Sequence, residues 1–262
     1  MARSGKSTSR RAPREKAEIP APLPPELRTV GQLVAETLRI FGRRFLLCLL
    51  LSVPVVVTDQ LVIGRHYVAS AVIYLASSPL FTAAYVLASV IVTGTRPTVR
   101  NVAMALGLGT LVFLPAAVAL PGLSIGSVIW LALVGLVVPA AVVEGGNALS
   151  LLRRGYALGR VDYVHAAGAL ATLVLILAAT RPPLWTVLRL EGGSSARVAF
   201  ALADIALSPM VFLGAAVLYL DQAARLGSPR PRPRRGDAHV PDADDADGEG
   251  RPDPQLQPGA PS

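Results

Sequence analysis

The sequence is poor in the side chains that bind metals. It contains a single cysteine, Cys48, so neither an intramolecular disulfide nor a cysteine zinc cluster can form within the chain. Its three histidines, His66, His165 and His239, lie too far apart for the i, i+4 spacing of a helical metal site. No phosphate-binding loop, nucleophile elbow or dinucleotide fingerprint occurs. The sequence therefore predicts no cofactor and no catalytic centre, and we expect a protein that is not an enzyme.

Charged residues are scarce as well. They make up 16% of the 262 residues, against about 25% in soluble domains, and they gather toward the two ends of the chain. Hydrophobic residues make up 52%, and the mean hydropathy is +0.52. A water-soluble domain of this composition would expose too much hydrocarbon surface. The composition therefore predicts an integral membrane protein.

Six apolar runs lie between the polar ends. They cover residues 45–63, 68–92, 102–120, 124–143, 164–180 and 198–220. A helix needs roughly 17–25 apolar residues to cross the hydrocarbon core. The runs do not alternate between polar and apolar residues, as barrel strands would, and a lone strand in lipid would leave its backbone unbonded. We therefore predict an all-α fold, a polytopic transmembrane bundle of about six spans.

The two ends of the chain differ from the middle. Residues 1–28 and 226–262 are charged and rich in proline, with little apolar surface to bury. Such segments are typical of disordered tails, and a docking role is the less favoured alternative. This division leaves residues 29–225 as the membrane domain.

Two amphipathic segments, 29–45 and 144–160, flank apolar runs. In the first, Leu33, Leu38 and Phe41 follow helical spacing, while arginines take other faces. In the second, Leu149 and Tyr156 are expected on the apolar face. We predict two helices that lie in the membrane interface, with basic side chains reaching anionic lipid headgroups.

The basic residues indicate an orientation. The net charge is +8, and nearly all basic residues are arginine, which is typical of a GC-rich bacterial genome. With six spans, one side carries Arg39, Arg43, Arg44, Arg96, Arg100, Arg153, Arg154, Arg160, Arg225 and the arginines of 230–235, and the other carries Arg65, Arg181, Arg189 and Arg197. The positive-inside rule then places both termini in the cytoplasm, at a bacterial inner membrane. Because these arginines flank apolar spans, we expect the lipid bilayer and other membrane proteins as partners, and no nucleic acid.

Prolines occur inside five of the predicted spans. They are Pro54, Pro79, Pro115, Pro139 and Pro209. Each removes a backbone donor and frees a carbonyl one turn earlier. Broken helices around a transport site and ordinary kinks in a proline-rich sequence both fit this pattern, and we favour kinks.

Glu144 stands where the fourth span ends. A carboxylate at that depth is costly unless it is paired. Arg153 and Arg154 are candidate partners if the chain folds back, and Arg100 is another. We favour a structural ion pair, and a ligand or proton site and simple exposure are the alternatives.

Asp59 and Asp204 lie inside the first and sixth predicted spans, on the side opposite the termini. Intramembrane carboxylates indicate function by default. One interpretation is a polar vestibule for a ligand or an ion. The other, which we favour, is a pair of charges that bind arginines of the same side and lock helices together.

Three short motifs carry a family resemblance. The first combines Pro139 and Glu144 with Ala148, Leu149, Arg153, Arg154, Tyr156 and Leu158; the others are Gly31, Leu38, Phe41 and Phe45 near the start, and Leu218, Tyr219 and Asp221 near the end. Across residues 29–225 the chain resembles the glycerophosphoryl diester phosphodiesterase membrane domain and related YciC-like families of bacterial membrane proteins. The resemblance implies a membrane unit of six or so helices. It implies no phosphodiesterase activity here, because no polar region is long enough for that catalytic domain.

Three functions remain open from the sequence. We favour a non-enzymatic scaffold or accessory component of the bacterial cell envelope. The alternative is a small transporter or channel component with a polar site near Asp204 and Asp59. A membrane enzyme that acts on lipid is the weakest of the three.

Overall fold

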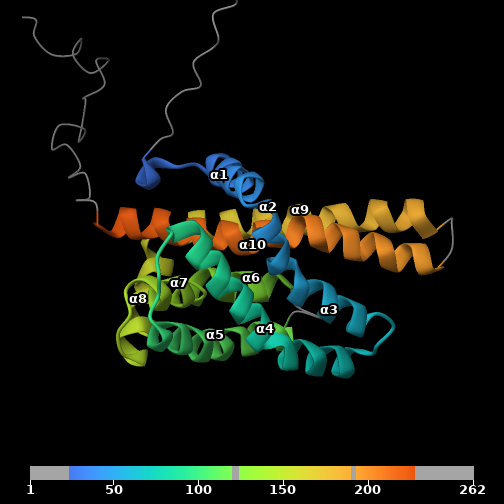
Figure 1. The fold of residues 1–262 in the computed structure, drawn as a ribbon, viewed down its shortest axis with the longest axis horizontal. Coiled ribbons are helices and arrows are strands. Elements are labelled where there is room, and N and C mark those ends of the chain that lie inside the picture. The colour runs from blue at the N-terminus through green and yellow to red at the C-terminus, as the bar shows by residue number, and fades with distance from the viewer. Residues whose placement is uncertain (1–23, 120–123, 190–192, 228–262) are drawn as a thin grey trace, which may run out of the picture. The chain divides into compact units, whose positions relative to one another are not determined.

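The computed structural model describes residues 24–119, 124–189 and 193–227 (Figure 1). Every regular element within these ranges is a helix, which confirms the predicted all-α fold. The helices belong to one compact unit, and a second unit, Pro229–Ser262, lies outside the described residues. Most of the two predicted tails, 1–28 and 226–262, also lies outside them.

Six helical segments of the described chain are long and apolar enough to cross a membrane. Four are single helices: α4 (Tyr67–Thr93), α5 (Val99–Ala119), α9 (Tyr163–Arg189) and α10 (Gly193–Gly227). The first span consists of α2 (Phe45–Leu49), the 3-10 turn η2 (Leu50–Ser52) and α3 (Val53–Val62), and the fourth of α6 (Ser124–Val134) and α7 (Val137–Val143). The chain is therefore a multi-pass membrane protein, as the apolar runs predict.

The last two helices are longer than the predicted spans. The runs 164–180 and 198–220 predict where the apolar side chains stop, but α9 continues to Arg189 and α10 continues to Gly227. A helix need not end where hydropathy falls, because its backbone hydrogen bonds form within the helix and do not require apolar side chains. The additional turns of α10 carry the charged residues Asp221 and Arg225.

The prolines act in two ways. Pro54 lies in the first turn of α3. Pro139 lies in the first turn of α7, just after Gly135 and Leu136 interrupt the helix of the fourth span. At a helix start the missing donor costs little. Pro79, Pro115 and Pro209 instead lie inside continuous helices.

Side chains of α6 bond to α5 around its proline, Pro115. The indole Nε1 of Trp130 donates to the carbonyl of Val112 at 2.8 Å, and the hydroxyl of Ser127 donates to that of Ala116 at 2.9 Å. In lipid no water is available for such carbonyls, so donors from a neighbouring helix are valuable. These bonds therefore hold α6 against the kinked part of α5.

The first amphipathic segment forms α1 (Val30–Arg43). A capping box between Thr29 and Gln32 starts the helix, because each side chain satisfies a backbone donor of the first turn. The helix buries Leu33 and packs on α9 and α10, outside the bundle in Figure 1. Leu38 remains 55% exposed, as expected for a helix at a lipid surface.

The second segment forms α8 (Ala148–Val161), and the face that it buries against the protein is not the apolar face expected to meet the lipid. Leu151, Gly155, Leu158 and Gly159 are buried. By contrast, Leu149 and Tyr156 are 59% and 43% exposed. Hydrophobic periodicity does not detect a glycine, yet Gly155 and Gly159 allow α8 to approach the backbone of the fourth span around Val137 and Leu133.

The bundle has two ends. The α8 end includes α8, the connection between α4 and α5, and the last turns of α10. The α3–α4 end includes the connection from Ile63 to His66. In Figure 1 the two ends lie at opposite sides of the view.

We expect Gly159→Ala to destabilise the protein by about 1–3 kcal/mol, the usual cost of overpacking. A Cβ at this position would lie 2.2 Å from the carbonyl oxygen of Leu133, which is backbone and cannot rotate away. Thermal unfolding in detergent measures the effect. Gly107→Ala in α5 is the control, because its Cβ would meet no atom within 4 Å. Equal unfolding temperatures for the two variants would contradict this packing.

Candidate functional site

Glu144 is the centre of a polar cluster at the α8 end. The Nε of Arg154 donates to both carboxylate oxygens at 2.9 Å, and the Tyr219 hydroxyl donates to Oε1 at 3.0 Å. These side chains come from the C-terminus of α7, from α8 and from α10. The cluster therefore joins three elements through one carboxylate.

A glycine turn makes the pairing of Glu144 and Arg154 possible. Gly145 and Gly146 have φ values of +65° and +132°, which residues with a Cβ rarely adopt. The turn reverses the chain, and the Asn147 side chain then caps α8 by accepting from the Ser150 amide at 2.8 Å. This arrangement brings Arg154 back to a carboxylate ten residues earlier in the chain.

Of the three predicted partners of Glu144, the structure selects Arg154. Arg153 is the next residue on α8 and therefore points about 100° away, and it is exposed. Arg100, at the start of α5, is exposed as well. The Glu144 side chain itself is 33% exposed, so the pair lies at the edge of the bundle.

A second polar cluster, which the sequence did not predict, lies beside the C-terminus of α10. Asp221 is fully buried and accepts from the Arg28 Nη1 at 3.1 Å. Arg225 forms an ion pair with Asp162 and also donates through Nη2 to the Arg28 carbonyl at 2.9 Å. The Gln222 amide donates to the Asp162 carbonyl at 3.2 Å. We call these five residues the Asp221 cluster.

The Asp221 cluster attaches the N-terminal segment to the bundle. Residues Pro25–Leu27 form a 3-10 turn, and Arg28 contacts α10 193 positions along the chain. The predicted tail 1–28 is therefore too long, because its last residues belong to the folded unit. In the sequence Arg28 does not differ from the other basic residues of the tail. Its partner, Asp221, can be identified only from the packing of α1 against α10.

Several buried polar atoms of this region have no hydrogen-bond partner among the described residues. They are His165 Nε2, Asp221 Oδ2, Gln222 Oε1 and Arg225 Nε. Leaving such a group unpaired costs about 1–3 kcal/mol. These unpaired atoms thus lower the free energy of unfolding. The charged pairs of the cluster depend on one another, because they share the same buried region.

Asp59 lies near the end of α3, where the Tyr74 hydroxyl donates to its Oδ1 at 3.0 Å. It lines an open cavity of about 200 Å³ together with Val62, Ile63, Tyr74 and Phe200. Asp204 is fully buried on α10, one turn beyond Phe200, and does not line this cavity. The two carboxylates therefore do not face a common cavity.

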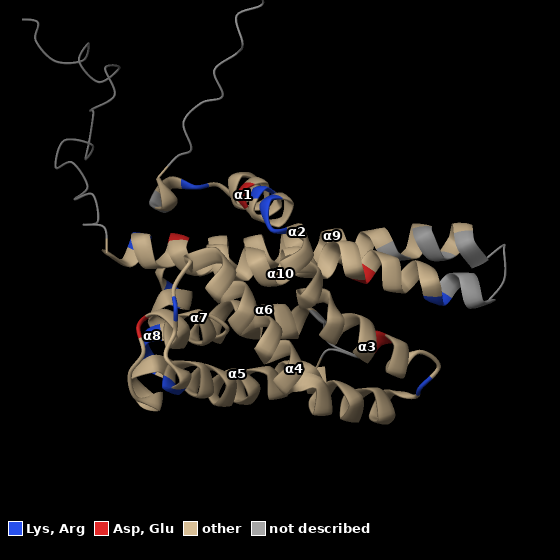
Figure 2. Cartoon of the chain, viewed as in Figure 1, with Lys and Arg blue, Asp and Glu red and all other residues tan. Residues whose placement is uncertain are grey.

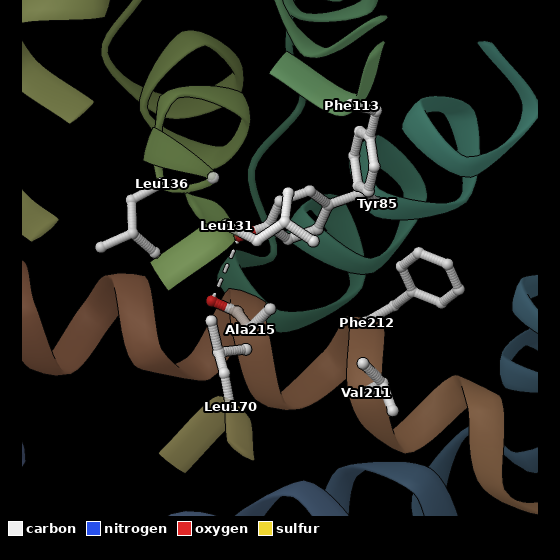
Figure 3. Close-up of a pocket in the computed structure, with 9 residues that line it drawn as sticks. Tyr85, Phe113, Leu131, Leu136, Leu170, Val211, Phe212 and Ala215 are labelled. Atoms are coloured by element: carbon white, nitrogen blue, oxygen red, sulfur yellow. Dashed lines mark hydrogen bonds between the residues drawn. The ribbon is translucent and has the colours of Figure 1, made fainter. Parts of the chain in front are cut away.

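Two further cavities are mainly apolar. One of about 70 Å³ lies between α4, α5, α6, α9 and α10, and Figure 3 shows the Tyr85 hydroxyl donating to the Ala215 carbonyl at its wall, at 3.4 Å. An open groove of about 640 Å³ between α6 and α9 is lined by residues such as Ile129 and Leu175. Within the described residues no group of His, Cys, Asp and Glu side chains could hold a metal ion.

We expect Arg28→Ala and Asp221→Asn each to destabilise the protein, and the double variant to lose much less than the sum of the two. A buried charge that loses its partner costs about 3–5 kcal/mol. Once Asp221 is neutral, removing Arg28 adds little. Chemical or thermal unfolding of the four proteins in detergent gives the coupling energy. Additive losses would contradict a direct interaction.

Comparisons with family models, with curated proteins and with solved structures found no match for this chain. The resemblance to the phosphodiesterase membrane domain therefore stays a prediction. Three residues that carry it, Glu144, Arg154 and Tyr219, are in direct contact in the fold.

Proposed function

We propose that the chain is a non-enzymatic multi-pass component of a bacterial cytoplasmic membrane, acting as a scaffold or accessory subunit. One observation carries this proposal: the described acidic side chains of the α8 end are used in ion pairs between separate segments of the chain. Glu144 pairs with Arg154, Asp162 with Arg225 and Asp221 with Arg28. Carboxylates bound to arginines in this way support a structural role rather than acid–base catalysis.

The distribution of charge supports an orientation with the α8 end in the cytoplasm. That end carries Arg96, Arg100, Arg153, Arg154, Arg160 and Arg225, and Arg28 bonded to α10, against the three described carboxylates Glu144, Asp162 and Asp221. Among the described residues of the α3–α4 end, Arg65 and Arg197 stand against Asp59 and Asp204. Cytoplasmic connections are enriched in arginine and lysine, so both termini would be cytoplasmic.

Reporter proteins fused after Arg65 and after Arg96 test this orientation. We expect alkaline phosphatase activity only from the first fusion and fluorescence of a cytoplasmic reporter only from the second. The two sites flank α4, a single span of 27 residues. The reverse pattern would contradict the orientation, and equal signals would contradict the span.

A small transporter is the second candidate function, and the cavity beside Asp59 favours it. An intramembrane carboxylate next to an open cavity is a common arrangement in ion and proton pathways. Asp59 also accepts a hydrogen bond from Tyr74, so the same geometry serves a structural role. The two functions predict different effects when Asp59 and Asp204 are neutralised: a loss of stability for a structural role, and a change of flux for a transporter.

We expect Asp59→Asn combined with Asp204→Asn to lower the amount of folded protein and its unfolding temperature, because buried bonds are lost. Membrane abundance and thermal unfolding measure this effect. Proton flux into liposomes that contain the purified chain, followed with a pH-sensitive dye, measures transport. Glu36→Gln is the control, since its pair with Arg39 spans one exposed helical turn. Normal abundance and unfolding together with a changed flux would instead support a transporter.

A further inference from the structure

We propose that the α4–α5 connection and α8 together form a binding site for the phosphate of an anionic phospholipid. The basic side chains of this headgroup site are Arg96, Arg100 and Arg153. Arg96 and Arg100 flank the start of α5, and Arg153 lies on α8. The inference holds whether the chain is a scaffold or a transporter.

The described residues of the α8 end carry an excess of positive charge. Their carboxylates, Glu144, Asp162 and Asp221, each have an arginine partner. Arg96, Arg100, Arg153 and Arg160 form no ion pair with a described carboxylate. The described part of this end therefore attracts anions.

The start of α5 and the turn before α8, which are far apart in the chain, are in contact. The Asn101 side chain packs against Gly145, and a Cβ on that glycine would lie 3.0 Å from its amide. The first turn of α5 is thus held beside the turn that leads into α8. Figure 2 shows basic segments of the α4–α5 connection and of α8 gathered at the same end.

The rotation of α8 about its axis is also fixed. Arg154 is held inward by Glu144, and Gly155 and Gly159 press against the fourth span. Arg153 must therefore point outward, away from the carboxylate that holds its neighbour. It is exposed, in agreement with this geometry.

Apolar side chains beside the arginines favour a lipid over a soluble anion. Leu149, Arg153, Tyr156 and Arg160 follow one another at spacings of four, three and four residues, so they form one stripe on α8. Leu149 and Tyr156 are 59% and 43% exposed, and the guanidinium of Arg160 lies over the Tyr156 ring at 5.5 Å. On α5, Val99 is 87% exposed. Apolar and aromatic side chains between arginines suit the boundary of headgroups and acyl chains, and not a water-filled anion site.

The test uses the purified full chain in neutral detergent. Phosphatidylglycerol and phosphatidylcholine are titrated, and the rise in unfolding temperature and the lipids retained in native mass spectrometry are measured. We expect selective binding of phosphatidylglycerol. The triple variant Arg96→Gln, Arg100→Gln, Arg153→Gln should bind it about a hundredfold more weakly, at about fivefold for each arginine. Its unfolding without lipid should match the wild type, because none of the three arginines forms an ion pair with a described residue.

Two controls make the result specific. Arg43→Gln with Arg44→Gln removes exposed basic charge from the junction of α1 and α2, outside the headgroup site, and it should leave most of the affinity. An equal loss in both variants would indicate a diffuse field and would overturn a discrete site. Inorganic phosphate and soluble glycerophosphoglycerol form the other arm. Protection by either at the concentration at which the lipid acts would identify a soluble anion and overturn the lipid assignment, as would equal binding of phosphatidylcholine.

Discussion

A carboxylate in or beside the membrane core is costly unless donors of the protein bind it, and this constraint organises the α8 end. Glu144 cannot rely on bulk water alone, so Arg154 and Tyr219 are brought to it from two other helices. The buried carboxylate of Asp221 requires Arg28 in the same way. Each bond links segments that are far apart in the chain, and the bonds add directional contacts to the hydrophobic packing of the bundle.

The position of α8 follows from this constraint together with two glycines. Gly155 and Gly159 let the helix approach the fourth span closely, and the ion pair of Glu144 with Arg154 sets its rotation. One face of α8 is thereby buried, and the other carries a stripe of arginine and apolar side chains at the surface. The contacts that bury one face of α8 thus place the arginines of the opposite face at the surface, where they form the proposed lipid site.

The two ends of the bundle differ in how their carboxylates are bound. At the α8 end the carboxylates are committed to arginines, and the remaining arginines face outward. At the α3–α4 end Asp59 borders a cavity with Tyr74. A scaffold role depends on the first end, and a transport role would depend on the second. The lipid site belongs to the first end and is compatible with either role.

The sequence by itself determined the helical class, the six apolar runs and the existence of two amphipathic helices, because these follow from the local spacing of apolar residues. It also narrowed the partners of Glu144 to three arginines. Only the tertiary structure decided that Arg154 is the partner, that Arg28 binds Asp221, and that glycines form the buried face of α8. Those facts depend on contacts between residues far apart in the chain and on backbone approach, neither of which leaves a local pattern in hydropathy.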